Sequence, residues 1–118
     1  METRAGRHAA LTKRLLDAVL ATSGQTPSEL RRAVLTRAAR LGGGGGETRD
    51  GVPAHLAGYV DKVALHAYKV TDEDLAALKR AGNSDDVLFE ATVSAALGAA
   101  LGRLERGLNA LGRGGEER

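Results

Sequence analysis

The chain has 118 residues but no cysteine, no tryptophan and only three other aromatic side chains, Tyr59, Tyr68 and Phe89. Without cysteine it cannot form a disulfide, supply a thiolate nucleophile, or hold zinc or an iron–sulfur cluster through sulfur. Its hydrophobic content of 42% therefore comes mainly from Ala, Leu and Val. Strands favour β-branched and aromatic residues, so this composition predicts an all-α fold. The helical patterns along the chain predict a compact bundle of about five helices.

The sequence also lacks a long hydrophobic run near its N-terminus. Lys13, Arg14 and Asp17 interrupt the segment that a signal peptide or a membrane span would need. We therefore expect a cytoplasmic protein without a membrane partner. The length fits one domain, which we place at residues 1–112.

Charge is unevenly distributed along the chain. Residues 1–49 carry nine Lys or Arg against four acids, whereas residues 50–118 carry eight against eleven. Such asymmetry suits self-association, in which a basic face of one subunit meets an acidic face of another, so we expect a homo-oligomer. The basic residues are spread out without stacking aromatics among them, which does not favour nucleic acid as a partner.

The first half of the chain shows two helical patterns and one glycine tract. A helix is expected over residues 9–22, with Leu11, Leu15, Ala18 and Val19 on its buried face. Thr26 and Pro27 have the form of an N-cap and a first helical residue, which predicts a second helix to about residue 41. Its arginines (Arg31, Arg32, Arg37, Arg40) are expected to be partly exposed. Residues 42–51, which include five consecutive glycines, predict a flexible loop.

The second half shows three more helices with clear terminal signals. Pro53 is expected to begin a helix over residues 53–68. Thr71 and Asp74 have the spacing of a capping box for a short helix that ends at Gly82. Ser84 is expected to cap a long last helix that runs to about residue 111, before a disordered tail at residues 113–118.

Two apolar features follow the last predicted helix. Leucines at alternating intervals of four and three form one seam: Leu97, Leu101, Leu104, Leu108 and Leu111. Small residues form a second stripe that would let another helix backbone come close: Ala91, Ala95, Gly98, Ala99 and Gly102. Two readings of the small-residue stripe stay open, a core contact within one chain and a subunit interface.

Residues 58–111, GYVDKVALHAYKVTDEDLAALKRAGNSDDVLFEATVSAALGAALGRLERGLNAL, resemble the C-terminal part of the carboxymuconolactone decarboxylase and alkylhydroperoxidase D superfamily. The capped helix VTDEDLAALKRAG and the helix start SDDVLFEATVSAA carry the resemblance. It implies an all-helical domain that assembles into dimers, trimers or hexamers. Peroxidase members of that family use a Cys-x-x-Cys pair, so a thiol peroxidase is excluded for this chain. The decarboxylase members need no such pair and remain compatible with it.

Chemistry, if the chain performs any, is expected on the helix at residues 53–68. His55, Tyr59, Lys62 and His66 fall at i, i+4, i+7 and i+11 and share one face. The functional interpretation makes His66 a general base or a metal ligand that faces Glu90 of the last helix, with Tyr59 and Lys62 beside it. The alternative interpretation is a solvated polar face.

We expect neither a metal nor a cofactor. His55 and His66 are eleven residues apart, which separates them by about 16 Å along a helix, too far to share one ion. At the start of the last helix Asp85, Asp86 and Glu90 stand where a DNA-reading helix would need basic or amide side chains.

Two functions follow from the sequence. The first is an oligomeric structural or interaction subunit, a non-thiol relative of the alkylhydroperoxidase D proteins that could serve a redox protein as its accessory. The second is a cofactor-free acid–base lyase that resembles carboxymuconolactone decarboxylase, with His66 and Glu90 as its acid and base.

Overall fold

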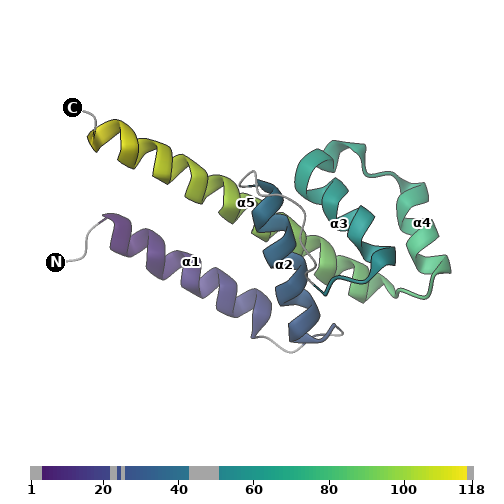
Figure 1. Ribbon diagram of the computed structural model, residues 1–118. Helices are drawn as coiled ribbons and strands as arrows, with labels where there is room; N and C mark the ends of the chain where they lie inside the picture. Colours follow the sequence, from purple (N-terminus) through teal and green to yellow (C-terminus); the bar gives the residue numbers. More distant parts are fainter. Residues whose placement is uncertain (1–3, 22–23, 25, 43–50, 117–118) are drawn as a thin grey trace.

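The computed structural model of the chain describes residues 4–21, 24, 26–42 and 51–116, and the side chains among them except at residues 4, 5, 8 and 113–116. These residues form five α-helices and one short 3-10 helix, with no strand among them (Figure 1). The helices are α1 (Arg4–Leu20), α2 (Ser28–Gly42), α3 (Ala54–His66), α4 (Asp72–Arg80) and α5 (Asp85–Glu116), with the 3-10 helix η1 (Ala67–Lys69) after α3. The all-α class predicted from composition is confirmed.

Helix α5 is the spine of the molecule. Its 32 residues span about 48 Å at 1.5 Å per residue, which accounts for most of the longest extent of 55 Å. Helix α2 packs across its middle, and α3 and α4 cover its N-terminal half (Figure 1). The buried core is aliphatic and is built mainly from α2, α3 and α5, with Val34, Leu56, Val60, Leu88 and Ala95 among its members.

The contact between α2 and α5 depends on glycine. A Cβ placed on Gly98 would lie 2.2 Å from the carbonyl oxygen of Leu35, and one placed on Gly42 would lie 2.5 Å from that of Ala99. Both obstacles are backbone atoms, so the two helices can approach this closely only where a side chain is missing. Gly42 therefore belongs to the last turn of α2 and not to the predicted loop, whose remaining glycines at residues 43–46 lie outside the described residues.

The small-residue stripe of α5 is the face that α2 and the core cover. Its members Ala91, Ala95, Gly98, Ala99 and Gly102 are all buried within the single chain. Of the two readings of this stripe, the structure supports the core contact. The stripe is not free to act as a surface for a second subunit, which corrects the predicted interface.

Helix α1 lies beside the C-terminal half of α5, and the two run past the rest of the body toward the same end (Figure 1). The face predicted to be buried is turned outward, since Leu11 is 54% and Leu15 51% exposed. Leu20 is buried instead, and Leu16 is partly buried. The doublet Leu15-Leu16 gives α1 apolar side chains on two sides, so helical periodicity alone did not decide which side meets the core.

The predicted helix ends in the second half are largely confirmed. Thr71 and Asp74 form a reciprocal capping box at the start of α4. Gly82, at a φ of +106°, ends α4, and the N–H of Asn83 returns to the carbonyl of Leu78 in a Schellman arrangement. The Ser84 hydroxyl accepts a bond from the N–H of Val87 at 3.2 Å. Helix α5 then continues to Glu116, beyond the expected end at residue 111, so the predicted disordered tail is helical at residues 113–116; residues 117–118 lie outside the described residues.

At the start of α2 the outcome differs from the expectation. The helix begins at Ser28, close to the predicted position, but the hydroxyl of Thr26 is buried without a hydrogen-bond partner and so caps nothing. Arg31, expected at the surface, is 7% exposed, and its guanidinium donates a hydrogen bond to the carbonyl of Val19 at the end of α1. Burial of Arg31 thereby links α1 to α2.

By length and composition one described helix segment, Asp85–Gly112, is apolar enough to cross a membrane. Of its most apolar stretch, 39% is buried inside the protein. A core helix of a soluble protein satisfies the same criterion, so the cytoplasmic location stays a prediction.

Candidate functional site

The predicted polar stripe of α3 is divided among several environments. Tyr59 is buried, and its hydroxyl lies 2.6 Å from the hydroxyl of Thr92 on α5. Since Thr92 donates its own hydrogen to the carbonyl of Leu88 at 2.6 Å, Tyr59 must be the donor of this pair. The phenol is thus committed to a contact between α3 and α5.

Lys62 forms an ion pair with a residue of α4. Its ammonium lies 2.9 Å from the carboxylate of Asp74, the same residue that closes the capping box with Thr71. The hydrogen bond from Lys62, followed by that from the Thr71 N–H, lowers the pKa of Asp74 below its ordinary value of 3.8. Lys62 therefore serves as a tie between α3 and α4.

The two histidines of the stripe are exposed. His66 is the last residue of α3, and its ring meets that of Tyr68 edge to face with centroids 6.1 Å apart. Tyr68 is itself 81% exposed. His55 occupies the first turn of the same helix, so each histidine lies at one end of α3.

Glu90 is held by the connection between α1 and α2. Its carboxylate accepts a hydrogen bond from the N–H of Thr26 at 2.6 Å and lies so close to Gly24 that a Cβ there would be 2.3 Å from Oε1. This contact fastens the connection to α5. A carboxylate at the start of α2 also complements the positive end of that helix.

The four predicted catalytic residues thus have four different surroundings. The contacts described above join Tyr59 to Thr92, Lys62 to Asp74, His66 to Tyr68 and Glu90 to Thr26. A base and its orienting acid are expected within hydrogen-bond reach of one another, and none of the contacts just described joins two of the four. In the described part of the chain no group of three or more His, Asp or Glu side chains is placed to hold a metal ion. The acid–base site stays a prediction.

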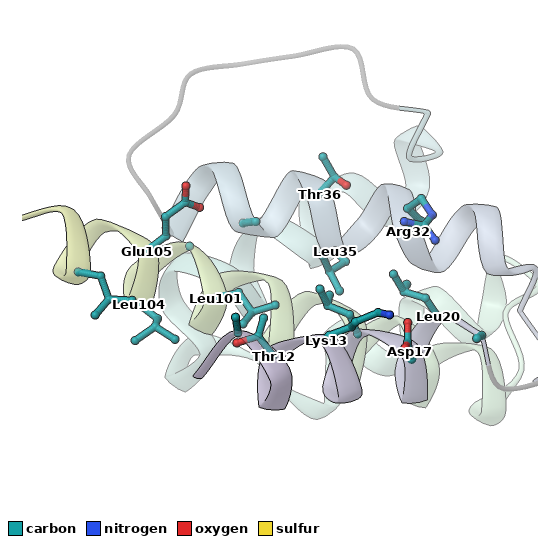
Figure 2. A pocket seen from close by; sticks show the side chains of 16 residues that line it. Thr12, Lys13, Asp17, Leu20, Arg32, Leu35, Thr36, Leu101, Leu104 and Glu105 are labelled. Atoms are coloured by element: carbon teal, nitrogen blue, oxygen red, sulfur yellow. The ribbon is translucent and has the colours of Figure 1, made fainter. Parts of the chain in front are cut away.

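A cavity of about 780 Å³ lies elsewhere, between α1, α2 and the C-terminal half of α5. Figure 2 shows Leu20, Leu35 and Leu101 contributed to it by the three helices in turn. Leu104 and Leu108 also line it and are each 45% exposed, so the cavity opens to solvent. Its charged lining residues are of both signs and comprise Lys13, Asp17, Arg32 and Glu105. None of the four predicted catalytic residues contributes to it.

Large apolar side chains remain exposed on both helices that flank the cavity. On α1 these are Leu11 and Leu15; on the outer face of α5 they are Phe89, Val93 and Leu111, with exposed fractions of 70%, 37% and 74%. The leucine seam predicted from the sequence supplies Leu101, Leu104 and Leu108 to the cavity. Helical periodicity predicts neither the exposure of Phe89 nor the contribution of α1, although the Leu15-Leu16 doublet signals a helix that is apolar on two sides.

Fold and site together define a class: an all-α protein with a leucine-lined cavity between α1, α2 and α5. No family model, no curated protein and no solved structure matches the chain. The resemblance to the alkylhydroperoxidase D superfamily therefore stays a prediction.

Proposed function

We propose that the protein is an oligomeric structural or interaction subunit, which covers the apolar surface of α1 and α5 when it assembles with further copies of itself. The observation that carries this proposal is the leucine-lined cavity between α1 and the C-terminal half of α5. Clustered exposed apolar side chains rimmed by polar residues are typical of protein–protein interaction sites. Burial of such surface is the main driving force of protein association.

The arrangement of the exposed residues supports the same proposal. Leu11 and Leu15 on α1 and Leu104, Leu108 and Leu111 on α5 belong to the two helices that project together from the body (Figure 1). The lyase alternative has no comparable support, because its four residues are engaged in separate contacts.

The test is the mass of the protein in solution, measured by sedimentation or light scattering over a range of concentrations. We expect a multiple of the 12.2 kDa chain mass. Leu108→Asp should shift the population toward the monomer, since the carboxylate would have to be buried. Leu65→Asp is the matched control: Leu65 is 43% exposed, almost the same as Leu108, but lies on α3 away from the cavity.

A wild-type chain that stays at 12.2 kDa at every concentration tested would refute the proposal. An equal loss of assembly in both variants would show that the cavity has no special part in it.

A further inference from the structure

The outer face of α5 carries an apolar stripe that no other described element of the chain covers. It begins at Phe89 and Val93, continues through the exposed residues Ala96 and Ala100, and ends at Gly107 and Leu111. These positions follow one another at intervals of three, four or seven residues, so they share one side of the helix. Within the seven-residue step Arg103 lies on the same side, and its guanidinium donates a hydrogen bond to the Ala64 carbonyl of α3. The stripe is distinct from the buried small-residue stripe, which faces α2.

The two ends of this stripe differ in shape. At the N-terminal end Phe89 projects into solvent with 70% of its surface exposed. At the C-terminal end Gly107 has no atom within 4 Å of the place where a Cβ would stand. Around it Leu104, Leu108 and Leu111 are 45%, 45% and 74% exposed. In packed helices, four residues at i, i+3, i+4 and i+7 form the hole into which a side chain of a facing helix fits. Here these four residues are Leu104, Gly107, Leu108 and Leu111, and the floor of the hole is the glycine.

We propose that a second copy of this chain docks on the outer face of α5, with the two α5 helices antiparallel and Phe89 of each seated over Gly107 of the other. A two-fold axis that exchanges residues 89 and 107 passes near residue 98, so the small side chains Ala96 and Ala100 of both copies meet at the centre. Small residues at the crossing permit close helix approach. Such an interface is isologous and closes as a dimer.

Charge favours this direction of pairing. Asp85 and Asp86 lie in the first turn of α5, whereas Arg103 and Arg106 lie in its C-terminal half. In the antiparallel register Asp86 of one copy stands level with residue 110 of the other, roughly 6 Å along the axis from Arg106. The acidic first turn of one helix therefore lies against the end of the other helix that carries these arginines. Parallel pairing would place the two acidic ends together.

The second copy also continues the apolar surface already described. Leu104 and Leu108 belong both to the cavity lining and to the hole around Gly107. Docking of Phe89 would therefore cover the open side of the cavity. This inference rests on the proposed self-association and specifies the surface and register by which it occurs.

The test uses the absence of cysteine in the natural chain, which gives a disulfide assay with no background. The variant Phe89→Cys/Gly107→Cys should form a covalent dimer under mild oxidation, several-fold more than either single variant. Within one chain the two positions are eighteen residues apart, about 27 Å along a helix, so they cannot pair with each other. In the proposed register a single cysteine, at position 89 or at position 107, lies far from the same position of the second copy. The reason is that positions 89 and 107 are at opposite ends of the interface.

A second variant tests the hole without cysteine. A Cβ at position 107 has no atom within 4 Å, and the substitution Gly107→Leu replaces a helix-destabilising glycine, so the fold should be kept. It fills the hole, and we expect the dissociation constant of the dimer to rise by about tenfold or more. Phe89→Ala combined with Gly107→Leu should recover part of the loss, because the large and small residues have exchanged places.

The outcomes separate this inference from the proposed function. An assembled protein in which the double cysteine variant gives no more covalent dimer than the single variants would overturn the α5 interface and leave self-association standing. A monomer at all concentrations would overturn both. A monomer that instead co-sediments with phosphatidylcholine vesicles would overturn both as well and would identify a lipid surface as the occupant of the stripe.

Discussion

The Cα of Gly98 on α5 lies against the backbone of Leu35 on α2, so that a Cβ at position 98 would stand 2.2 Å from the Leu35 carbonyl oxygen. That oxygen belongs to a helical backbone and cannot turn aside as a flexible side chain would. The separation of α2 and α5 is therefore determined by the absence of a side chain at Gly98. Both helices line the cavity, so its shape depends on their separation.

Gly98→Ala should destabilise the fold by roughly 1–3 kcal/mol, since overpacking of the α2–α5 contact outweighs the gain of about 1 kcal/mol in helix propensity. Gly58→Ala, inside helix α3, is the matched control, because no atom lies within 4 Å of the new Cβ. It should stabilise by up to about 1 kcal/mol. Urea unfolding of the two variants measures both values, and an equal stabilisation would contradict the close approach.

The ion pair between Arg37 on α2 and Asp61 on α3 should contribute measurably to stability. Two parallel hydrogen bonds of 2.6 and 2.8 Å join them, and their side chains are 24% and 35% exposed. Asp61→Asn should cost about 1 kcal/mol.

The exposed pair Arg80–Glu73, at 65% and 76% exposure, provides the comparison for that experiment. Glu73→Gln should change the free energy of unfolding by no more than about 0.5 kcal/mol. A larger effect at Glu73 than at Asp61 would show that burial does not govern these pairs.

The pH dependence of stability should contain a contribution from Asp74. Its pKa is lowered in the folded state by Lys62 and by the Thr71 N–H, so the unfolded chain binds this proton more readily. The stabilisation is therefore fully present above the ordinary value of 3.8 and is lost as pH falls through the lower pKa of the folded state.

Thermal unfolding of the wild type and of Asp74→Asn over that acid range measures the contribution. The variant should start less stable at neutral pH and should lose less stability on acidification. Parallel acid limbs in the two proteins would mean that Asp74 does not titrate differently on folding.

Tyr59 and His66 should respond differently to truncation, although the sequence placed them in one stripe. Tyr59→Phe removes the hydrogen that the phenol donates to Thr92 and should cost about 1 kcal/mol. His66→Ala removes an exposed ring and should leave stability within about 0.5 kcal/mol of the wild type, with assembly unchanged. Denaturant titration and mass in solution test the two claims. A strongly destabilised His66→Ala protein would reveal a structural role that the exposed position does not suggest.

The parts of the fold that depend on local chemistry were predictable from the sequence. The Thr71 capping box and the Ser84 cap involve residues three positions apart, and Gly82 ends α4 because it can adopt a positive φ. In each case the signal and the structure it specifies lie within one turn of helix.

The parts that depend on distant partners were not predictable. The stripe around Gly98 indicates a close neighbour but not which helix supplies it, and the neighbour is α2 of the same chain. The polar face of α3 is divided because α5 covers Tyr59 while α4 supplies Asp74 to Lys62. Arg31 is buried only because the end of α1 offers it the Val19 carbonyl.

The attachment of α1 has a consequence for local motion. The firm contacts of α1 are concentrated at its C-terminal end, where Leu20 is buried and the Val19 carbonyl accepts the hydrogen bond from Arg31. Closer to its N-terminus, Leu11 and Leu15 are about half exposed. Amide protons of α1 should therefore exchange with solvent through openings that leave α2 and α5 joined. The first helix and the central pair then form separate cooperative units, and the width of the space between them can change without loss of the core.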